Sequence, residues 1–105
     1  MHEPNLNNLN MIYKKYRVTG RVQGVFYRQS TYQKATELGL TGYVQNQPNG
    51  EVYVWAKGEA DMISQLEKWL MIGPPRASVS GVILLSLTPE EIAHLDRLTD
   101  FTIAR

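Results

Sequence analysis

The sequence contains no cysteine. Its absence excludes disulfide bonds, zinc–thiolate sites and cysteine nucleophiles, and it is compatible with a reducing compartment. The sequence also lacks an excess of either charge, because 11 lysine and arginine residues face 10 acidic residues, which gives a formal net charge of +1. A general nucleic-acid binder usually carries a stronger basic bias, so this balance argues against a nucleic-acid partner.

Long apolar segments are also missing. The longest apolar run, VILLSL at 82–87, is too short to cross a bilayer, and the first residues lack the apolar centre of a signal peptide. We therefore expect a cytoplasmic protein without a membrane partner. The asparagine-rich residues 1–11 offer little to bury and predict a flexible tail, which leaves 12–105 as a single domain.

Apolar periodicity divides this domain into short elements. Period-two alternation predicts strands at 14–22, 40–46, 50–58, 77–87 and 100–105. Apolar residues at helical spacing predict helices at about 27–38, 59–72 and 88–98. This order of two strand–helix–strand units predicts an α+β fold, the ferredoxin-like split βαβ sandwich. Both long helices should cover one face of an antiparallel sheet, and the other face should be at least partly exposed.

Turn and cap signals support these boundaries. Gly39 suits the left-handed residue that ends a helix, and the pair Asn49–Gly50 favours a tight hairpin. Thr88, Pro89 and Glu91 form the pattern of a capping box with proline at the first helical position, so a short helix should begin there.

The segment GRVQGVFYRQS, residues 20–30, lies where the first strand passes into the first helix. Gly24 permits a backbone conformation in which several successive N–H groups converge on one anion. Arg28 follows in the first helical turn, where the helix dipole disfavours a cation unless an anion is bound. A turn of this kind without a ligand is also common, so the segment alone leaves both interpretations open.

Asn46 stands at the end of a strand, directly before the hairpin. Read alone, it is equally consistent with a functional carboxamide and with a turn residue that bonds its own backbone. For Asn49, beside Gly50, the turn role is the expected one.

Two motifs together resemble the acylphosphatase family. GRVQGVFYR is similar to the first signature of that family, and GYVQNQPNGEVYVWAKG is similar to the second. GPPRASV resembles the segment that follows the second helix there. The resemblance covers about 14–87 and the closing DFTIAR. It implies a small ferredoxin-like enzyme that hydrolyses the carboxyl–phosphate anhydride of acyl phosphates to a carboxylate and inorganic phosphate.

The resemblance also implies roles for individual residues. Arg28 matches the phosphate-binding arginine of the family, and Asn46 matches the asparagine that positions the attacking water. The loop that surrounds the phosphate matches Gln23, Gly24, Val25, Phe26 and Tyr27. No metal, cofactor or covalent phosphoenzyme is implied, and inorganic phosphate should act as product and competitive inhibitor. A monomer is expected.

The sequence departs from the family pattern in three respects. Tyr27 stands where the family usually has phenylalanine, so its hydroxyl needs a hydrogen-bond partner. Phe26 occupies a position that is often small and would narrow the mouth of the pocket. The tail and the segment 88–98 lie outside the shared pattern, and no function is assigned to them.

Other interpretations use other residues. Tyr53 and Trp55 should project from the face away from the helices, where RNA-recognition modules stack bases, but the basic-glycine-aromatic string of those modules is missing. The alternative to an enzyme is a non-catalytic module of the same fold that binds RNA or phosphate-containing ligands. His2 and His94 have no second ligand at metal-binding spacing, so we expect no metal site.

Overall fold

A computed structural model describes residues 11–105. The elements are β1 (Met11–Arg21), α2 (Tyr27–Glu37), β2 (Thr41–Asn46), β3 (Val52–Glu59), α3 (Ala60–Ile72), β4 (Ser78–Leu85), α4 (Pro89–Arg97) and β5 (Phe101–Ala104). Their order and type agree with the sequence-based prediction. The strand β1 begins three residues earlier than predicted, so Met11 belongs to the sheet and not to the predicted tail. His2 and the remainder of the predicted tail lie outside the described residues.

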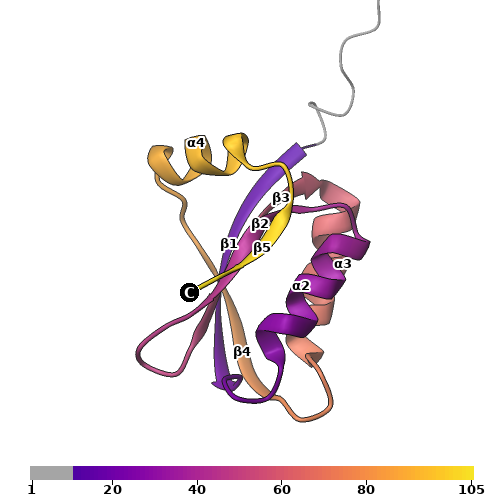
Figure 1. The fold of residues 1–105 in the computed structure, drawn as a ribbon, viewed down its shortest axis with the longest axis vertical. Coiled ribbons are helices and arrows are strands. Elements are labelled where there is room, and N and C mark those ends of the chain that lie inside the picture. Colours follow the sequence, from indigo (N-terminus) through magenta and orange to yellow (C-terminus); the bar gives the residue numbers. More distant parts are fainter. Residues whose placement is uncertain (1–10) are drawn as a thin grey trace, which may run out of the picture.

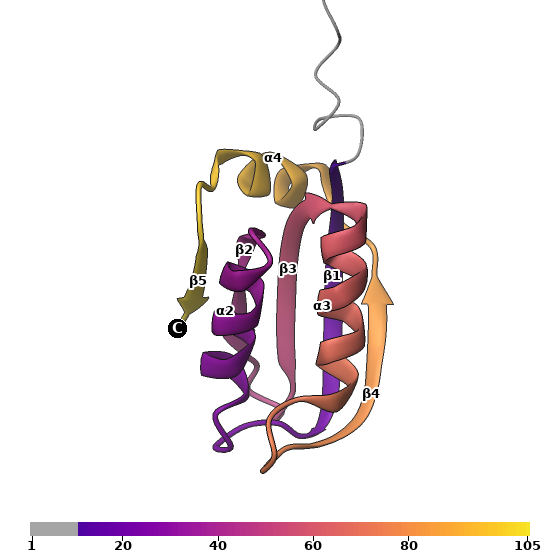
Figure 2. The same ribbon diagram turned by 90° about the vertical axis from the view of Figure 1, so that its right-hand side faces the viewer.

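The strands form one sheet in the order β4-β1-β3-β2-β5. In each split βαβ unit one strand separates the two that are joined through a helix: β3 lies between β1 and β2, and β1 lies between β4 and β3. Four strands pair antiparallel, as predicted, but β5 pairs parallel with β2. The predicted antiparallel sheet thus describes four of the strands, and β5 adds one parallel pair at its edge. The reason is α4, which crosses the end of the sheet between the edge strands β4 and β5, so the chain enters β5 from that end (Figure 1, Figure 2).

The helices α2 and α3 lie side by side on one face of the sheet (Figure 2). The core between them and the sheet contains side chains that are at most 2% exposed. They include Tyr16, Val18, Val44, Val52, Val54, Ile63, Leu66 and Leu70. Alternate residues of the central strands supply these groups, as the period-two pattern predicts.

The predicted helix and turn signals are present. The backbone N–H of Gly39 (φ 72°) donates to the carbonyl of Thr36, and that of Leu40 donates to Ala35, which is a Schellman ending of α2. At α4, the Glu91 N–H donates to the Thr88 hydroxyl at 3.1 Å and the Thr88 N–H donates to the Glu91 carboxylate at 2.9 Å. This is the capping box.

The opposite face of the sheet is more covered than expected, because α4 packs over one end of it. Trp55 is only 7% exposed; its ring stacks on Tyr43 with centroids 4.4 Å apart, and its indole N–H donates to Glu91 at 2.6 Å. His94 contacts Tyr43 edge-on at 5.6 Å. Tyr53 and Trp55 were predicted to project from this face; Tyr53 is half-buried, and Trp55 is covered by α4.

Candidate active site

The start of α2 lacks the groups that usually complete a helix N-terminus. No side chain caps it, and its first turn contains no acidic residue. The N–H groups of residues 23–26 make no hydrogen bond to any part of 11–105, and those of 27–29 come before the first helical bond, from Ser30 to Phe26. A row of backbone donors therefore surrounds the end of the helix, where an anion is stabilised by the dipole.

The β1–α2 loop (residues 22–26) owes this shape to two left-handed residues. Gly24 has φ 72°, and Phe26 has φ 66°. A Cβ added at Gly24 would meet no atom within 4 Å, so lack of space does not explain the glycine. The glycine is required for the left-handed backbone conformation. The predicted role of Gly24 in the loop conformation agrees with this geometry.

The loop is tied to the β2–β3 hairpin by Gln23. Its side-chain amide donates to the carbonyls of Gln47 and Glu51, both at 2.8 Å. Val25 is buried, at 3% exposure. Neither side chain lines the pocket described below, so Gln23 and Val25 hold the loop in place and only their backbone groups are available to a ligand.

Tyr27 anchors the first turn of α2 to the end of α3. Its hydroxyl donates to the Leu70 carbonyl at 2.7 Å, and burial raises the pKa of Tyr27. In a helix the Leu70 carbonyl would accept from the N–H of residue 74, but residue 74 is Pro74, which has no N–H. The carbonyl therefore needs a donor from elsewhere in the protein. The ring also passes close to Gly73 (φ 67°), where an added Cβ would lie 2.8 Å from it. The partner that the Tyr27 hydroxyl requires is therefore Leu70.

An ion pair between Arg17 on β1 and Glu51 holds the β2–β3 hairpin, which begins after Asn46, against the sheet. Arg17 donates two hydrogen bonds to the carboxylate of Glu51, at 2.9 and 2.8 Å. These bonds and one from Asn49 lower the pKa of Glu51. The side-chain oxygen of Asn49 also accepts a hydrogen bond from the Glu51 N–H at 3.0 Å, which confirms the turn role of Asn49. Of the pair Asn49–Gly50, only Gly50 has a positive φ, of 93°.

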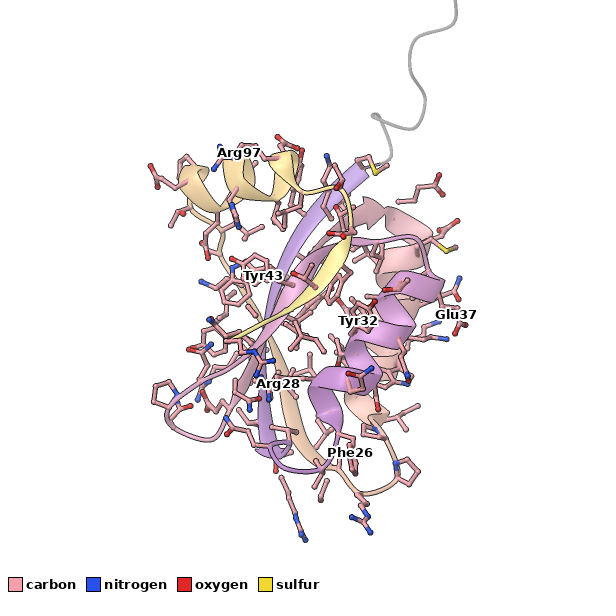
Figure 3. The ribbon with its side chains drawn as sticks, viewed as in Figure 1. Phe26, Arg28, Tyr32, Glu37, Tyr43 and Arg97 are labelled. Atoms are coloured by element: carbon pink, nitrogen blue, oxygen red, sulfur yellow. The ribbon has the colours of Figure 1, made fainter. Side chains whose placement is uncertain are left out.

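A pocket of about 400 Å³ opens at the start of α2. Its lining residues are Val22, Gly24, Phe26, Tyr27, Arg28, Gln29, Asn46, Ile103 and Arg105. Arg28 and Asn46 come from segments 18 positions apart and meet here because β1, β3 and β2 are adjacent in the sheet. Figure 3 shows Arg28 close to the strands and Phe26 below it, at the outer turn of the loop.

The polar groups of the pocket are available to a ligand. Within residues 11–105, Arg28 forms no ion pair, and the Asn46 side chain makes no hydrogen bond, so it does not bond its own backbone as a turn asparagine would. No aspartate or glutamate side chain is among the lining residues. The pocket therefore combines positive charge, backbone donors and two neutral carboxamides, those of Gln29 and Asn46, a set that suits a phosphoryl group.

Sequence reasoning missed the contribution of β5 to this pocket. Ile103 and Arg105 reach it because β5 pairs parallel with β2, whose end carries Asn46. The Arg105 carbonyl accepts from Gln45 at 3.0 Å. The alternation of DFTIAR predicted a strand but not its partner, and only the position of β5 beside β2 identifies Arg105 as a second cation at the site.

Within residues 11–105, no group of three histidine, cysteine, aspartate or glutamate residues is placed to hold a metal ion. None of the helices in this range combines the length and apolarity that a membrane crossing requires.

Comparison with known proteins agrees with this geometry. The family model described as Acylphosphatase matches residues 14–103, a region that runs through 88–98, which the sequence analysis placed outside the shared pattern. A protein named acylphosphatase from Methylococcus capsulatus is 46% identical over 88 residues, 84% of this chain and 90% of its own length.

Solved structures give the same result. An acylphosphatase from Coxiella burnetii superposes with a TM-score of 0.84 at 38% identity, covering 96% of this chain and 100% of that one. An acylphosphatase from Bacillus subtilis gives 0.78 at 25% identity, covering 90% and 99%. The predicted fold and the predicted resemblance are both confirmed, and the chain belongs to the acylphosphatase family.

Proposed function

We propose that this enzyme hydrolyses small-molecule acyl phosphates to a carboxylate and inorganic phosphate in the pocket at the start of α2. The observation that carries the proposal is the meeting of Arg28, Asn46 and the free N–H groups of the β1–α2 loop in one pocket that no aspartate or glutamate side chain lines. The names of the relatives support the same activity.

In this mechanism the phosphoryl group lies against the loop N–H groups and the Arg28 guanidinium. Arg28 is suited to bind two phosphoryl oxygens at once, because its planar fork matches their spacing. These donors are fixed before the substrate arrives, so they stabilise charge on the peripheral oxygens in the transition state without reorganisation.

Asn46 holds the attacking water. Its carboxamide has an acceptor oxygen and a donor NH₂, so it can orient a water molecule without repelling the anion. The water oxygen forms a new bond to phosphorus while the bond from phosphorus to the carboxyl oxygen breaks and its electron pair leaves with the carboxylate. A phosphoryl oxygen takes the proton of the water, so no side-chain base is needed. Holding both reactants in line supplies much of the rate increase.

The alternative of an RNA-binding module has lost its main support, since Trp55 is buried under α4 and unavailable for base stacking. Within the enzyme proposal, the chain acts as a cytoplasmic monomer. Size-exclusion chromatography tests the monomer, and a dimer mass would refute it.

Hydrolysis of benzoyl phosphate with inorganic phosphate as inhibitor tests the function. We expect turnover that excess chelator does not reduce, with competitive inhibition by phosphate. Binding of phosphate without turnover would indicate the non-catalytic module, and activity lost to chelator and restored by a divalent ion would refute the metal-free mechanism.

A further inference from the structure

Phe26 combines two unfavourable features. It is the one non-glycine residue among 11–105 with positive φ (66°), a region that is disfavoured for a bulky side chain. It is also a large apolar residue that is 68% exposed. Neither burial nor capping explains it, because its side chain makes no cap hydrogen bond at the start of α2.

A glycine would take this backbone conformation without strain, as Gly24 does two positions earlier. The aromatic ring therefore needs a reason of its own. Its location gives one: Phe26 lines the same pocket as Arg28, which follows two positions later, and it lies at the outer turn of the loop (Figure 3).

The lining of the pocket has two chemical characters. Arg28, Gln29, Asn46 and Arg105 supply polar groups, whereas Phe26, Ile103 and Val22 supply apolar surface. Val22 is only 1% exposed and Ile103 is half-buried, whereas Phe26 is exposed, so Phe26 is the largest open apolar surface that a ligand at the mouth would cover. An acyl phosphate has the matching division, with a charged phosphoryl group at one end and an organic group at the other.

We propose that Phe26 packs against the acyl group of the substrate and makes the enzyme selective for acyl phosphates whose acyl group is aromatic or extended and apolar. The inference rests on the proposed function, and it adds the class of acyl group. With the phosphoryl group held by Arg28 and the loop, the acyl group extends to the mouth of the pocket, and the Phe26 ring offers it a stacking surface.

The test compares kcat/KM for benzoyl phosphate and acetyl phosphate in the wild type, in Phe26→Ala and in Phe26→Gly. The measured quantity is the benzoyl-to-acetyl ratio of each variant relative to that of the wild type. A loss common to both substrates cancels within each ratio, and the difference in their intrinsic reactivity cancels in the comparison between proteins. We expect both variants to lower the ratio about tenfold, the scale of one aromatic contact. Phe26→Gly removes both the ring and the backbone strain. Phe26→Ala removes the ring but keeps the strain, because alanine has a Cβ in the same left-handed conformation.

Ile72→Ala is the matched control, because Ile72 is an exposed apolar residue (73%) that does not line the pocket. Its ratio should equal that of the wild type. A ratio unchanged or raised in Phe26→Ala and Phe26→Gly would overturn the proposal and leave the proposed function intact. A wild type that hydrolyses neither substrate would instead refute the proposed function.

Discussion

Replacing Tyr27 by phenylalanine removes one hydroxyl and restores the residue that acylphosphatases usually have at this position. In this chain the change should nevertheless destabilise the fold. The hydroxyl donates to the Leu70 carbonyl at 2.7 Å, and no helical N–H can replace it, because Pro74 occupies the position where that donor would be. The variant would leave a buried acceptor without a partner.

The size of the effect follows from this geometry. Tyr27 is 1% exposed and Leu70 is fully buried, so water cannot easily satisfy the carbonyl. An unsatisfied buried acceptor costs about 1–3 kcal/mol, and the greater hydrophobicity of phenylalanine offsets part of that loss. We therefore expect about 1–2 kcal/mol of lost stability. For a domain of this size that is a fall in Tm of roughly 5–10 °C.

Urea unfolding followed by tryptophan fluorescence measures this loss. The nearby Trp69, whose ring centroid is 5.7 Å from that of Tyr27, should report the transition. With an m-value of about 2 kcal/mol per molar, the midpoint should fall by roughly 0.5–1 M. Tyr32→Phe is the control on the same helix, because its hydroxyl has no hydrogen-bond partner within 11–105. Equal midpoints for Tyr27→Phe and wild type would refute the hydrogen-bond argument.

Three further predictions concern the site and α4. Arg28→Ala should lower turnover by about a hundredfold or more. Arg28→Lys should also have low turnover, because lysine cannot form the two parallel hydrogen bonds of the guanidinium. Near-normal hydrolysis by Arg28→Ala would refute the phosphate-binding role of Arg28. Asn46→Ala should abolish most turnover while phosphate still inhibits competitively, and a parallel collapse of phosphate affinity would make Asn46 a binding residue. Burial acts to raise the pKa of Glu91, but bonds from Lys15, Thr88 and Trp55 outweigh it and lower that pKa to about 2. Its contribution to stability is therefore present above about pH 4.5 and lost as the pH falls toward 2. Glu91→Gln should flatten that part of the denaturation curve, and an unchanged curve would contradict the attribution.

Local signals in the sequence predicted most of the fold. The left-handed ending at Gly39 and the capping box at Thr88 are formed by residues within six positions of one another, so they can be read without a tertiary structure. The parallel pairing of β5 could not be read in this way. It depends on where α4 delivers the chain, and α4 is placed by contacts such as the one between Trp55 and Glu91, 36 positions apart.

The site shows the same division. Arg28, Asn46 and Gly24 were identified because two motifs resemble a family, and the structure brings them to one pocket. The different tasks of the loop side chains were not predictable. Gln23 and Val25 face the hairpin and the core instead of the ligand, since alternate loop residues point in opposite directions and only packing decides which direction is the pocket.

Three consecutive residues show how the site is held in shape. Tyr27 is buried and bonded to α3, while its neighbours Phe26 and Arg28 face the pocket. A fixed Tyr27 should prevent the first turn of α2 from rotating to relieve the strain at Phe26, and the same restraint should hold Arg28 at the pocket. Because electrostatic catalysis depends on donors that are positioned beforehand, the stability of this anchor and the rate at the pocket should be linked. Tyr27→Phe should therefore lower kcat in the folded enzyme, although its hydroxyl contacts no substrate.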